Sequence, residues 1–158
     1  MRIRSAEERD AEPICAIYNQ GTEDRVATLE TALRSPDERR HWLASRDPRH
    51  PVIVESGVVG WGSLNTFNPR PVYDAVADFS VYVDRRWRGR RIGAALLRRL
   101  IEIAPGLGVH KLVLAAFPFN EAGMALYRRF GFSEVGVYHE QGQLDGRWVD
   151  VVVMEKLL

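Results

Sequence analysis

One segment near the middle of the chain joins a strand pattern to a loop rich in arginine and glycine. Alternating apolar and polar residues over Asp78–Asp84 predict a β-strand. The loop Arg85–Gly93 follows directly, and apolar residues then recur at helical spacing as far as Ile103. A strand that passes through such a loop into a helix directs several backbone N–H groups and the positive helix end at one point. The segment therefore predicts an α/β fold with an anion-binding site between strand and helix.

The composition of this loop suits a phosphate group. Five of the seven residues from Arg85 to Arg91 are arginine, whose planar guanidinium can pair with two phosphate oxygens at once. Gly89 and Gly93 allow the backbone to approach a ligand closely. A solvated basic turn and a nucleic-acid patch are the alternatives to a pyrophosphate site, because a single glycine-rich turn does not separate the three.

The overall charge argues against nucleic acid as the partner. Lys and Arg total 22 against 21 Asp and Glu, a net charge of +1, whereas proteins that bind nucleic acid usually carry a larger basic excess. One cysteine excludes an internal disulfide, and neither a long apolar run nor a signal-peptide profile is present. We expect a cytoplasmic protein with a small anionic ligand and no nucleic-acid or membrane partner. The four histidines lack ligand spacing, so no metal site is expected.

The rest of the chain alternates between helix and strand patterns and is expected to form one domain, residues 1–158. Helices are predicted over residues 10–20 with Asp10 as cap, from Ser35 through Leu43, over 91–104, and from Asn120 to Gly131. Strands are predicted over residues 1–4, 51–55, 58–64, 72–83, 111–116, 134–139 and 147–157. This order predicts an α/β domain with a mixed central sheet of about seven strands and about four helices.

The strand–loop–helix segment resembles the acetyl-CoA motif of the GNAT superfamily of acyl-CoA N-acyltransferases. The segment Asn120–Phe132 (Asn-Glu-Ala-Gly-Met-Ala-Leu-Tyr-Arg-Arg-Phe-Gly-Phe) is similar to the next helix of that superfamily, and the order and spacing of both motifs fit. The resemblance extends over nearly the whole chain. It implies the GNAT fold and an N-acetyltransferase that uses acetyl-CoA as cosubstrate, with direct attack of an amine on the thioester.

Shorter segments are similar to the phosphinothricin acetyltransferase group, which includes enzymes acting on arsinothricin and on methionine sulfoximine or sulfone. These segments are Ile17–Asn19, Ala27–Thr31, Glu38–Leu43, Val59–Ser63, Arg70–Tyr73 and Gly146–Asp150. The resemblance implies a homodimer that acetylates the α-amine of a small amino acid. It leaves open which amino acid is used and whether antibiotic or herbicide resistance is the selected role. An acetyltransferase for protein N-termini or lysines, and a catalytically silent acyl-CoA-binding module, are the alternatives.

The resemblance assigns acetyl-CoA to the arginine-rich loop and to the strand before it. Backbone N–H groups of the loop would receive the pyrophosphate, the strand would pair with the pantetheine arm, and Asn120 would bond that arm or cap its own helix. The chain departs from the motif Gln/Arg-x-x-Gly-x-Gly/Ala at Arg91, which replaces the middle glycine and implies altered backbone strain. The expected binding residues are Val81, Val83, Arg88, Gly89, Arg90, Arg91, Ile92, Gly93, Ala94 and Asn120.

Two side chains are expected to move protons, by comparison with the superfamily. Asp78 stands where the superfamily has a glutamate base, and its shorter side chain favours a water relay. Tyr127 matches the general acid that protonates the leaving thiolate. An Asp78 that is solvated or orders the loop at Arg70, and a Tyr127 that only packs, are the alternatives. The backbone N–H of Val83 or of its neighbour would stabilise the developing oxyanion.

The resemblance places the amino-acid substrate between the loop around Arg70 and the segment that follows the first helix. Arg70 would hold a carboxylate or phosphinate, with a free surface arginine as the alternative. Tyr73 and Leu29 would form walls of the pocket. Glu30 would bind the substrate ammonium group, in competition with the role given to Asp78.

Overall fold

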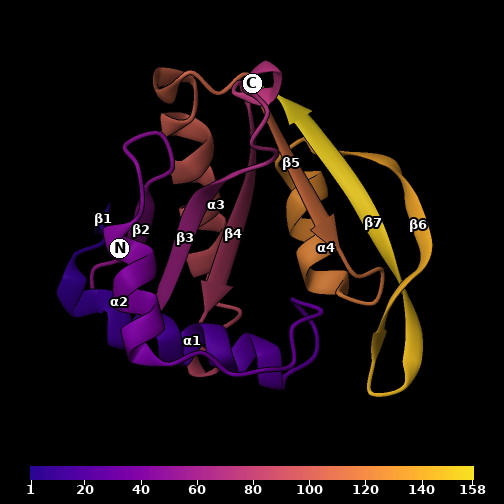
Figure 1. The fold of residues 1–158 in the computed structure, drawn as a ribbon, viewed down its shortest axis with the longest axis horizontal. Coiled ribbons are helices and arrows are strands. Elements are labelled where there is room, and N and C mark those ends of the chain that lie inside the picture. The colour runs from indigo at the N-terminus through magenta and orange to yellow at the C-terminus, as the bar shows by residue number, and fades with distance from the viewer.

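A mixed seven-stranded sheet organises the chain, which a computed structural model describes from residue 1 to residue 158 (Figure 1). The strands are β1 (Ile3–Ser5), β2 (Val52–Glu55), β3 (Gly60–Thr66), β4 (Val76–Val83), β5 (Lys111–Ala116), β6 (Ser133–Leu144) and β7 (Arg147–Leu157). The α-helices are α1 (Ala11–Glu23), α2 (Pro36–Ala44), α3 (Ile92–Ile103) and α4 (Glu121–Arg129). The predicted number and order of helices and strands are confirmed.

The strands lie in the order β1-β2-β3-β4-β5-β7-β6. Every neighbouring pair is antiparallel except β4 and β5, which are parallel and are connected through α3. A parallel pair needs such a crossover, because the chain must return to the same end of the sheet before the next strand begins.

Two predictions about local structure are wrong. The strand predicted from residue 72 begins only at Val76, because Pro71 opens a short 3-10 turn that extends to Tyr73. The Asp10 side chain does not cap α1. Its carboxylate pairs instead with Arg4, at 2.7 Å between Arg4 Nη1 and Asp10 Oδ2. α1 and β6 also extend past their predicted ends, to Glu23 and Leu144.

The other two predicted caps are confirmed. Ser35 Oγ accepts a hydrogen bond from the Glu38 N–H at 3.2 Å at the start of α2. Asn120 Oδ1 accepts one from the Gly123 N–H at 3.1 Å at the start of α4. Each side chain satisfies one of the backbone donors that a helix start leaves without a partner.

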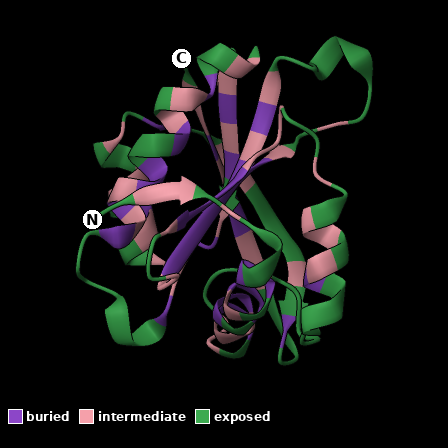
Figure 2. Ribbon diagram, turned by 90° about the vertical axis from the view of Figure 1, so that its left-hand side faces the viewer, coloured by how far each residue is buried: buried purple, intermediate pink, exposed green.

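Helices cover both faces of the sheet, and buried residues line the strands between them (Figure 2). α3 and α4 pack on one face against the largest core cluster, which includes Leu64, Phe79 and Leu112. α1 packs on the opposite face against a smaller cluster that includes Val54 and Trp61, with α2 at its margin. Alternation along each strand sends neighbouring side chains to these two cores.

Strands β4 and β5 separate after a short parallel contact, and this separation positions the site. Their pairing runs only from Val76 to Asp78 on β4 and from Lys111 to Val113 on β5. Beyond Asp78, β4 stays paired with β3 while β5 stays paired with β7, so the sheet opens between β4 and β5 (Figure 1). The edge of β4 that faces this opening, from Phe79 to Val83, has no neighbouring strand.

Candidate active site

A cavity of about 510 Å³ lies between the second half of β4, the start of α3 and one face of α4. Nine of the ten residues expected to bind acetyl-CoA line it: Val81, Val83, Arg88, Gly89, Arg91, Ile92, Gly93, Ala94 and Asn120. The tenth, Arg90, is not part of the lining, and its guanidinium carbon lies 4.7 Å from the ring centre of Trp87. The structure thus brings together residues that are about forty positions apart in the sequence, at the place where the motif predicted an anion site.

The start of α3 offers unpaired backbone donors to this cavity. The Ala95 N–H donates to the Arg91 carbonyl at 3.1 Å, which closes the first helical turn. The N–H groups of Ile92 and Gly93 precede that bond and therefore have no acceptor within the helix. No side chain caps this end. Several N–H donors and the positive helix end point into the cavity, an arrangement suited to a phosphate group.

Arg91, at the position of the missing glycine, adopts a left-handed backbone conformation with φ of 64°. Gly89 in the same loop also has a positive φ, 79°. A non-glycine residue in this region has a conformational cost of about 1 kcal/mol. The loop therefore keeps the backbone turn that glycine normally supplies. The replacement of the motif glycine by Arg91 adds backbone strain at this position.

Most of the arginines of the loop are engaged within the protein. Arg85 pairs with Glu23 and Asp24 at 3.0 and 2.9 Å, and Arg88 Nη1 pairs with Asp24 Oδ2 at 2.8 Å. Arg86 pairs with the buried carboxylate of Asp84. Three of the five guanidinium groups thus fasten the loop to its surroundings, and the anion site depends more on backbone donors than the arginine count suggested.

The free edge of β4 supplies further donors. The Asp84 N–H donates to the Val59 carbonyl at 2.8 Å, so alternate residues from Asp84 back to Asp78 direct their backbone groups towards β3. Val81 and Val83 direct theirs into the opening between β4 and β5. This edge can pair with an extended, amide-containing ligand as a neighbouring strand would.

A second cavity, of about 200 Å³, lies within the opening between β4 and β5. Its lining combines residues of β4 and β5 with residues from the segment after α1 and from α4 and its cap: Val26, Ala27, Asp78, Phe79, Ser80, Val81, Tyr82, Leu114, Ala115, Ala116, Asn120 and Tyr127. Val81, Asn120 and Tyr127 also line the larger cavity, so the two cavities adjoin at these residues.

Asp78 is the one carboxylate of this second cavity. Burial raises its pKa to about 6, against the hydrogen bonds from Asn65 and the Phe79 backbone, which lower it. The Asn65 amide nitrogen lies 3.5 Å from Asp78 Oδ1 and 3.1 Å from Ser80 Oγ. Ser63 Oγ donates to Asn65 Oδ1 at 2.9 Å, which fixes the orientation of the amide. A carboxylate with this pKa is suited to exchange protons near neutral pH.

Tyr127 reaches the cavity from α4. Its ring packs edge-on against Phe79, with 5.9 Å between ring centres, and its hydroxyl has no hydrogen-bond partner in the protein. Burial and the nearby Asp78 carboxylate raise the Tyr127 pKa, so the phenol stays protonated at neutral pH. The packing role and a role as proton donor are both compatible with this position.

Two expected substrate residues lie outside both cavities. Arg70 and Tyr73 are exposed in the loop between β3 and β4, where the Tyr73 ring packs against Phe67 with 5.7 Å between ring centres. The Arg70 side chain has no partner in the protein, and the Arg70 N–H donates to Asn68 Oδ1 at 3.0 Å.

The other two, Leu29 and Glu30, are adjacent in sequence but face different pockets. Leu29 lines a small cavity that shares Ala27, Ala115 and Ala116 with the Asp78 cavity. Glu30 lines a separate pocket, where it accepts hydrogen bonds from the Tyr18 hydroxyl and from Arg34. The structure therefore places Leu29 in a cavity next to the Asp78 cavity but does not bring Glu30 there.

Sequence reasoning missed several residues of the site. Asn65 is one, and only the pairing register of β3 with β4, which sets Asn65 opposite Asp78, reveals it. Others line the larger cavity: Trp87, Ala122, Gly123, Ala125, Leu126 and Arg129. For the five on α4, the helical spacing around Tyr127 was an available signal, whereas Trp87 lies in the loop before α3.

Two further observations concern metal binding and membrane-spanning helices. No group of three or more His, Cys, Asp or Glu side chains is arranged to hold a metal ion. None of the helices combines the length and the apolar character that a membrane crossing requires.

Comparisons with known proteins agree with this arrangement. The sequence profile of the Acetyltransferase (GNAT) family matches residues 12–132. An L-methionine sulfoximine/L-methionine sulfone acetyltransferase of Pseudomonas aeruginosa is 33% identical over 158 residues, which cover 97% of this chain and 92% of that protein.

Solved structures share the whole fold. A phosphinothricin acetyltransferase from Sinorhizobium meliloti, in complex with acetyl-CoA, superposes with a TM-score of 0.92 at 26% identity and covers 99% of this chain and 88% of its own. A ribosomal-protein-alanine N-acetyltransferase from Brucella melitensis superposes with a TM-score of 0.95 at 38% identity over 100% of both chains.

Proposed function

Because this chain belongs to the GNAT acetyltransferase family, we propose that it transfers the acetyl group of acetyl-CoA to the α-amine of a small amino acid. The substrate class is that of phosphinothricin, arsinothricin and methionine sulfoximine or sulfone. The observation that carries the proposal is the junction of two cavities at Tyr127, with Asp78 in the wall of the smaller one. The names of the Pseudomonas and Sinorhizobium relatives support the substrate class.

The larger cavity would hold acetyl-CoA. The N–H groups at the start of α3 would bind its pyrophosphate, and the free edge at Val81 and Val83 would pair with its pantetheine arm. Arg90 and Arg91 have no ion pair within the protein and would add positive charge beside the phosphates. The bound cosubstrate supplies an activated acetyl thioester.

Asp78 and Tyr127 would carry the proton transfers. With a pKa of about 6, Asp78 is ionised at neutral pH and can take a proton from the substrate ammonium group, directly or through one water. The free amine would then form a bond to the carbonyl carbon, and the Val83 N–H would stabilise the negative charge on the oxygen of the tetrahedral intermediate. As the bond from carbon to sulfur breaks, Tyr127 would donate its proton to the departing sulfur, and the nitrogen would release its extra proton, which restores the Tyr127 phenol.

The smaller cavity and the space beside it would hold the amino acid. Leu29 would form part of the wall, and the unpartnered Arg70 would pair with a carboxylate or with the side-chain oxyanion, next to Tyr73. Glu30 would act on the substrate ammonium only through an exchange of its present partners, Tyr18 and Arg34.

We also propose a cytoplasmic homodimer. The outer hairpin of β6 and β7 exposes Val135, Tyr138 and Trp148, and large exposed apolar side chains favour burial by a second copy. The single cysteine, Cys15, is buried and unpaired, as is common in a reducing compartment.

A second candidate function is acetylation of protein N-termini that begin with alanine. The solved structure from Brucella melitensis, which carries that name, is 38% identical over the full length of both chains. This function would need the Asp78 cavity to admit the first residues of a polypeptide.

The test is acetyl-CoA-dependent thiol release with a panel of amines. The panel contains phosphinothricin, arsinothricin, methionine sulfoximine, methionine sulfone, methionine, glutamate and a peptide that begins with alanine. Turnover on an amino acid with a tetrahedral side-chain group, and much slower turnover in Asp78→Ala, would support the proposal. Turnover on the peptide alone would support the second candidate. If the protein binds acetyl-CoA but releases no thiol with any compound of the panel, both candidates are overturned.

A further inference from the structure

A pocket of about 310 Å³ lies on the α1 and α2 side of the sheet, apart from the two cavities of the candidate active site. Six residues line it: Tyr18, Glu30, Arg34, Glu38, Arg39 and Trp42. None of them lines the Asp78 cavity or the cavity at the start of α3. Four of the six are charged, and acetyl transfer leaves most of these charges without a role.

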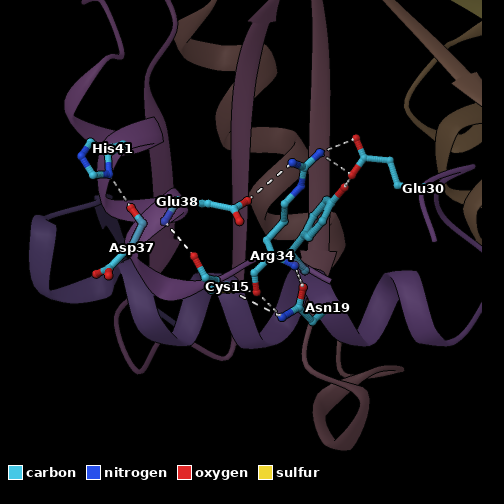
Figure 3. A network of polar contacts seen from close by, with 9 residues as sticks. Cys15, Asn19, Glu30, Arg34, Asp37, Glu38 and His41 are labelled. Carbon is cyan, nitrogen blue, oxygen red and sulfur yellow. Dashed lines mark hydrogen bonds and ion pairs between the residues drawn. The ribbon is translucent and has the colours of Figure 1, made fainter. Parts of the chain in front are cut away.

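Three of the four charged side chains pair with one another, and together they carry a net charge of −1. Arg34 lies between two carboxylates, with 2.9 Å to Glu30 Oε2 and 3.5 Å to Glu38 Oε2 (Figure 3). The Tyr18 hydroxyl donates to Glu30 as well. Tyr18, Glu30, Arg34 and Glu38 thereby form one network of polar contacts in the lining of the pocket.

Arg39 is the exception. Its side chain forms no hydrogen bond and no ion pair, only 8% of the residue is exposed, and Nε is buried without a partner. Its guanidinium carbon lies 4.1 Å from the ring centre of Tyr18, 4.6 Å from that of Trp42 and 5.6 Å from that of Trp61. Trp61 Nε1 is likewise buried without a partner.

Aromatic rings satisfy this guanidinium only in part. A ring face attracts a cation but leaves the in-plane N–H donors of the guanidinium without acceptors. Burial also lowers the pKa of Arg39, which shows that its surroundings disfavour the charge. A buried cation that no carboxylate contacts directly lowers stability, and an anion that pairs with it would reduce that cost.

We propose that the pocket is a binding site for a singly charged oxyanion, a carboxylate or a phosphinate, which pairs with the guanidinium of Arg39. A single charge is favoured because Glu30 and Glu38 stand at the same pocket and repel a more highly charged ligand. The flat fork of Arg39 matches the two oxygens of such a group.

The site adjoins the Asp78 cavity through a pair of tyrosines. Tyr18 of the pocket packs against Tyr82, with 5.3 Å between ring centres, and Tyr82 lines the Asp78 cavity. The oxyanion could therefore belong to the amino-acid substrate or to a separate small ligand. Binding at Arg39 does not require that acetyl transfer occurs, so the two proposals can fail separately.

The experiment is an NMR titration of the full-length protein, followed at the Trp42 indole N–H. Acetate and dimethylphosphinate serve as singly charged probes, sulfate as the doubly charged probe and chloride as the control for ionic strength. We expect a saturable shift with acetate and dimethylphosphinate. In Arg39→Met the dissociation constants should rise at least about tenfold, the ratio typical of loss of a charge-assisted pair.

Arg40→Met is the matched control, because Arg40 is the next residue on α2 and pairs at the surface with Asp37. It should bind both probes as the native protein does. If Arg39→Met does not fold, Arg39→Gln, which keeps donors but no charge, replaces it. Equal affinity of the native protein and the Arg39 variant for both probes would overturn the proposal. So would the absence of a saturable shift, or equal shifts with chloride.

Kinetics then separate the two sources of the anion. If the oxyanion belongs to the substrate, Arg39→Met raises KM for methionine sulfone or phosphinothricin while KM for acetyl-CoA stays constant. If the anion is a separate ligand, both KM values stay constant in Arg39→Met, while the dissociation constant for acetate still rises. Both results uphold the Arg39 site and differ only in what it binds.

Discussion

Asn65 of β3 stands directly opposite Asp78 of β4, with the Asn65 amide nitrogen 3.5 Å from the Asp78 carboxylate. The amide cannot turn freely, because Ser63 Oγ and Arg46 Nη2 both donate to Asn65 Oδ1, at 2.9 and 3.0 Å. Its N–H group is therefore held towards the carboxylate. A polar chain from Arg46 to Asp78 adjusts the proton affinity of the proposed base.

Removal of this amide should make Asp78 a stronger proton acceptor. The Asn65 hydrogen bond lowers the Asp78 pKa, so Asn65→Leu should raise it and shift the acidic limb of kcat/KM to higher pH. The measurement is the pH profile of thiol release. Asn68→Ala, in the exposed loop after β3, should leave the limb in place. If the acidic limb of the kcat/KM profile lies at the same pH in Asn65→Leu as in the native protein, Asp78 is not the titrating group.

Replacement of Asp78 itself should slow turnover. Asp78→Asn removes the proton acceptor with little change in volume, and kcat/KM should fall about 10²- to 10⁴-fold, as for loss of a general base. Steady-state kinetics check the rate, and equilibrium titration with acetyl-CoA checks that the cosubstrate still binds. A fall of less than about threefold would assign the base to another group.

The pH dependence of the folding stability should reflect the ionisation of Asp78. The Asp78 pKa is raised from 3.8 to about 6 on folding, so between these pH values the folded protein holds a proton that the unfolded chain has released. The Asp78 contribution is therefore fully present below pH 3.8 and is lost as pH rises through about 6. The Tm of Asp78→Asn minus that of the native protein should grow across this window and level off above it. Thermal unfolding at several pH values measures this difference.

Tyr127→Phe distinguishes packing from proton donation. The ring contacts with Phe79 and Phe132 remain in the variant, so Tm and acetyl-CoA affinity should change little. If the hydroxyl protonates the leaving sulfur, kcat should fall about 10²-fold. An unchanged kcat would leave Tyr127 with the packing role alone.

The left-handed conformation of Arg91 predicts a stabilising substitution. Arg91→Gly removes the strain at a φ of 64°, offset in part by the greater freedom of glycine in the unfolded chain. The gain should be up to about 1 kcal/mol, or roughly 2–4 °C in Tm. Arg91→Ala removes the same charge but keeps the strain, and should show no gain. Differential scanning calorimetry of the two variants tests this, and equal Tm values would refute the strain argument.

Much of the fold could be predicted because its patterns are local. Ser35 and Asn120 are residue types that cap helix N-termini, so they indicate where α2 and α4 begin. The segment Lys111–Ala116 is apolar enough to predict a central strand. The errors arose where two local signals competed. Asp10 has the side chain of a helix cap, but the guanidinium of Arg4, from β1, binds it more strongly.

The site was less predictable, since it depends on register and on contacts between distant segments. The loop at Arg88–Gly93 is contiguous in sequence, and all of its residues except Arg90 line the expected cavity. Asn65 became visible only through strand pairing, and the different surroundings of Leu29 and Glu30 depend on how one loop packs. The isolation of Arg39 leaves no signature in the sequence. Of its aromatic neighbours, only Trp42, three residues further along the same predicted helix, could have been inferred.

The opening between β4 and β5 allows both substrates to be bound at the same time. One cavity faces α3 and α4, the other is bounded by Val26 and Ala27 after α1, and they adjoin at Val81, Asn120 and Tyr127. Donor and acceptor can thus enter from opposite sides of the sheet and be present together. The acyl group never needs to rest on the enzyme, so double-reciprocal plots should intersect rather than run parallel, as they would for a ping-pong cycle.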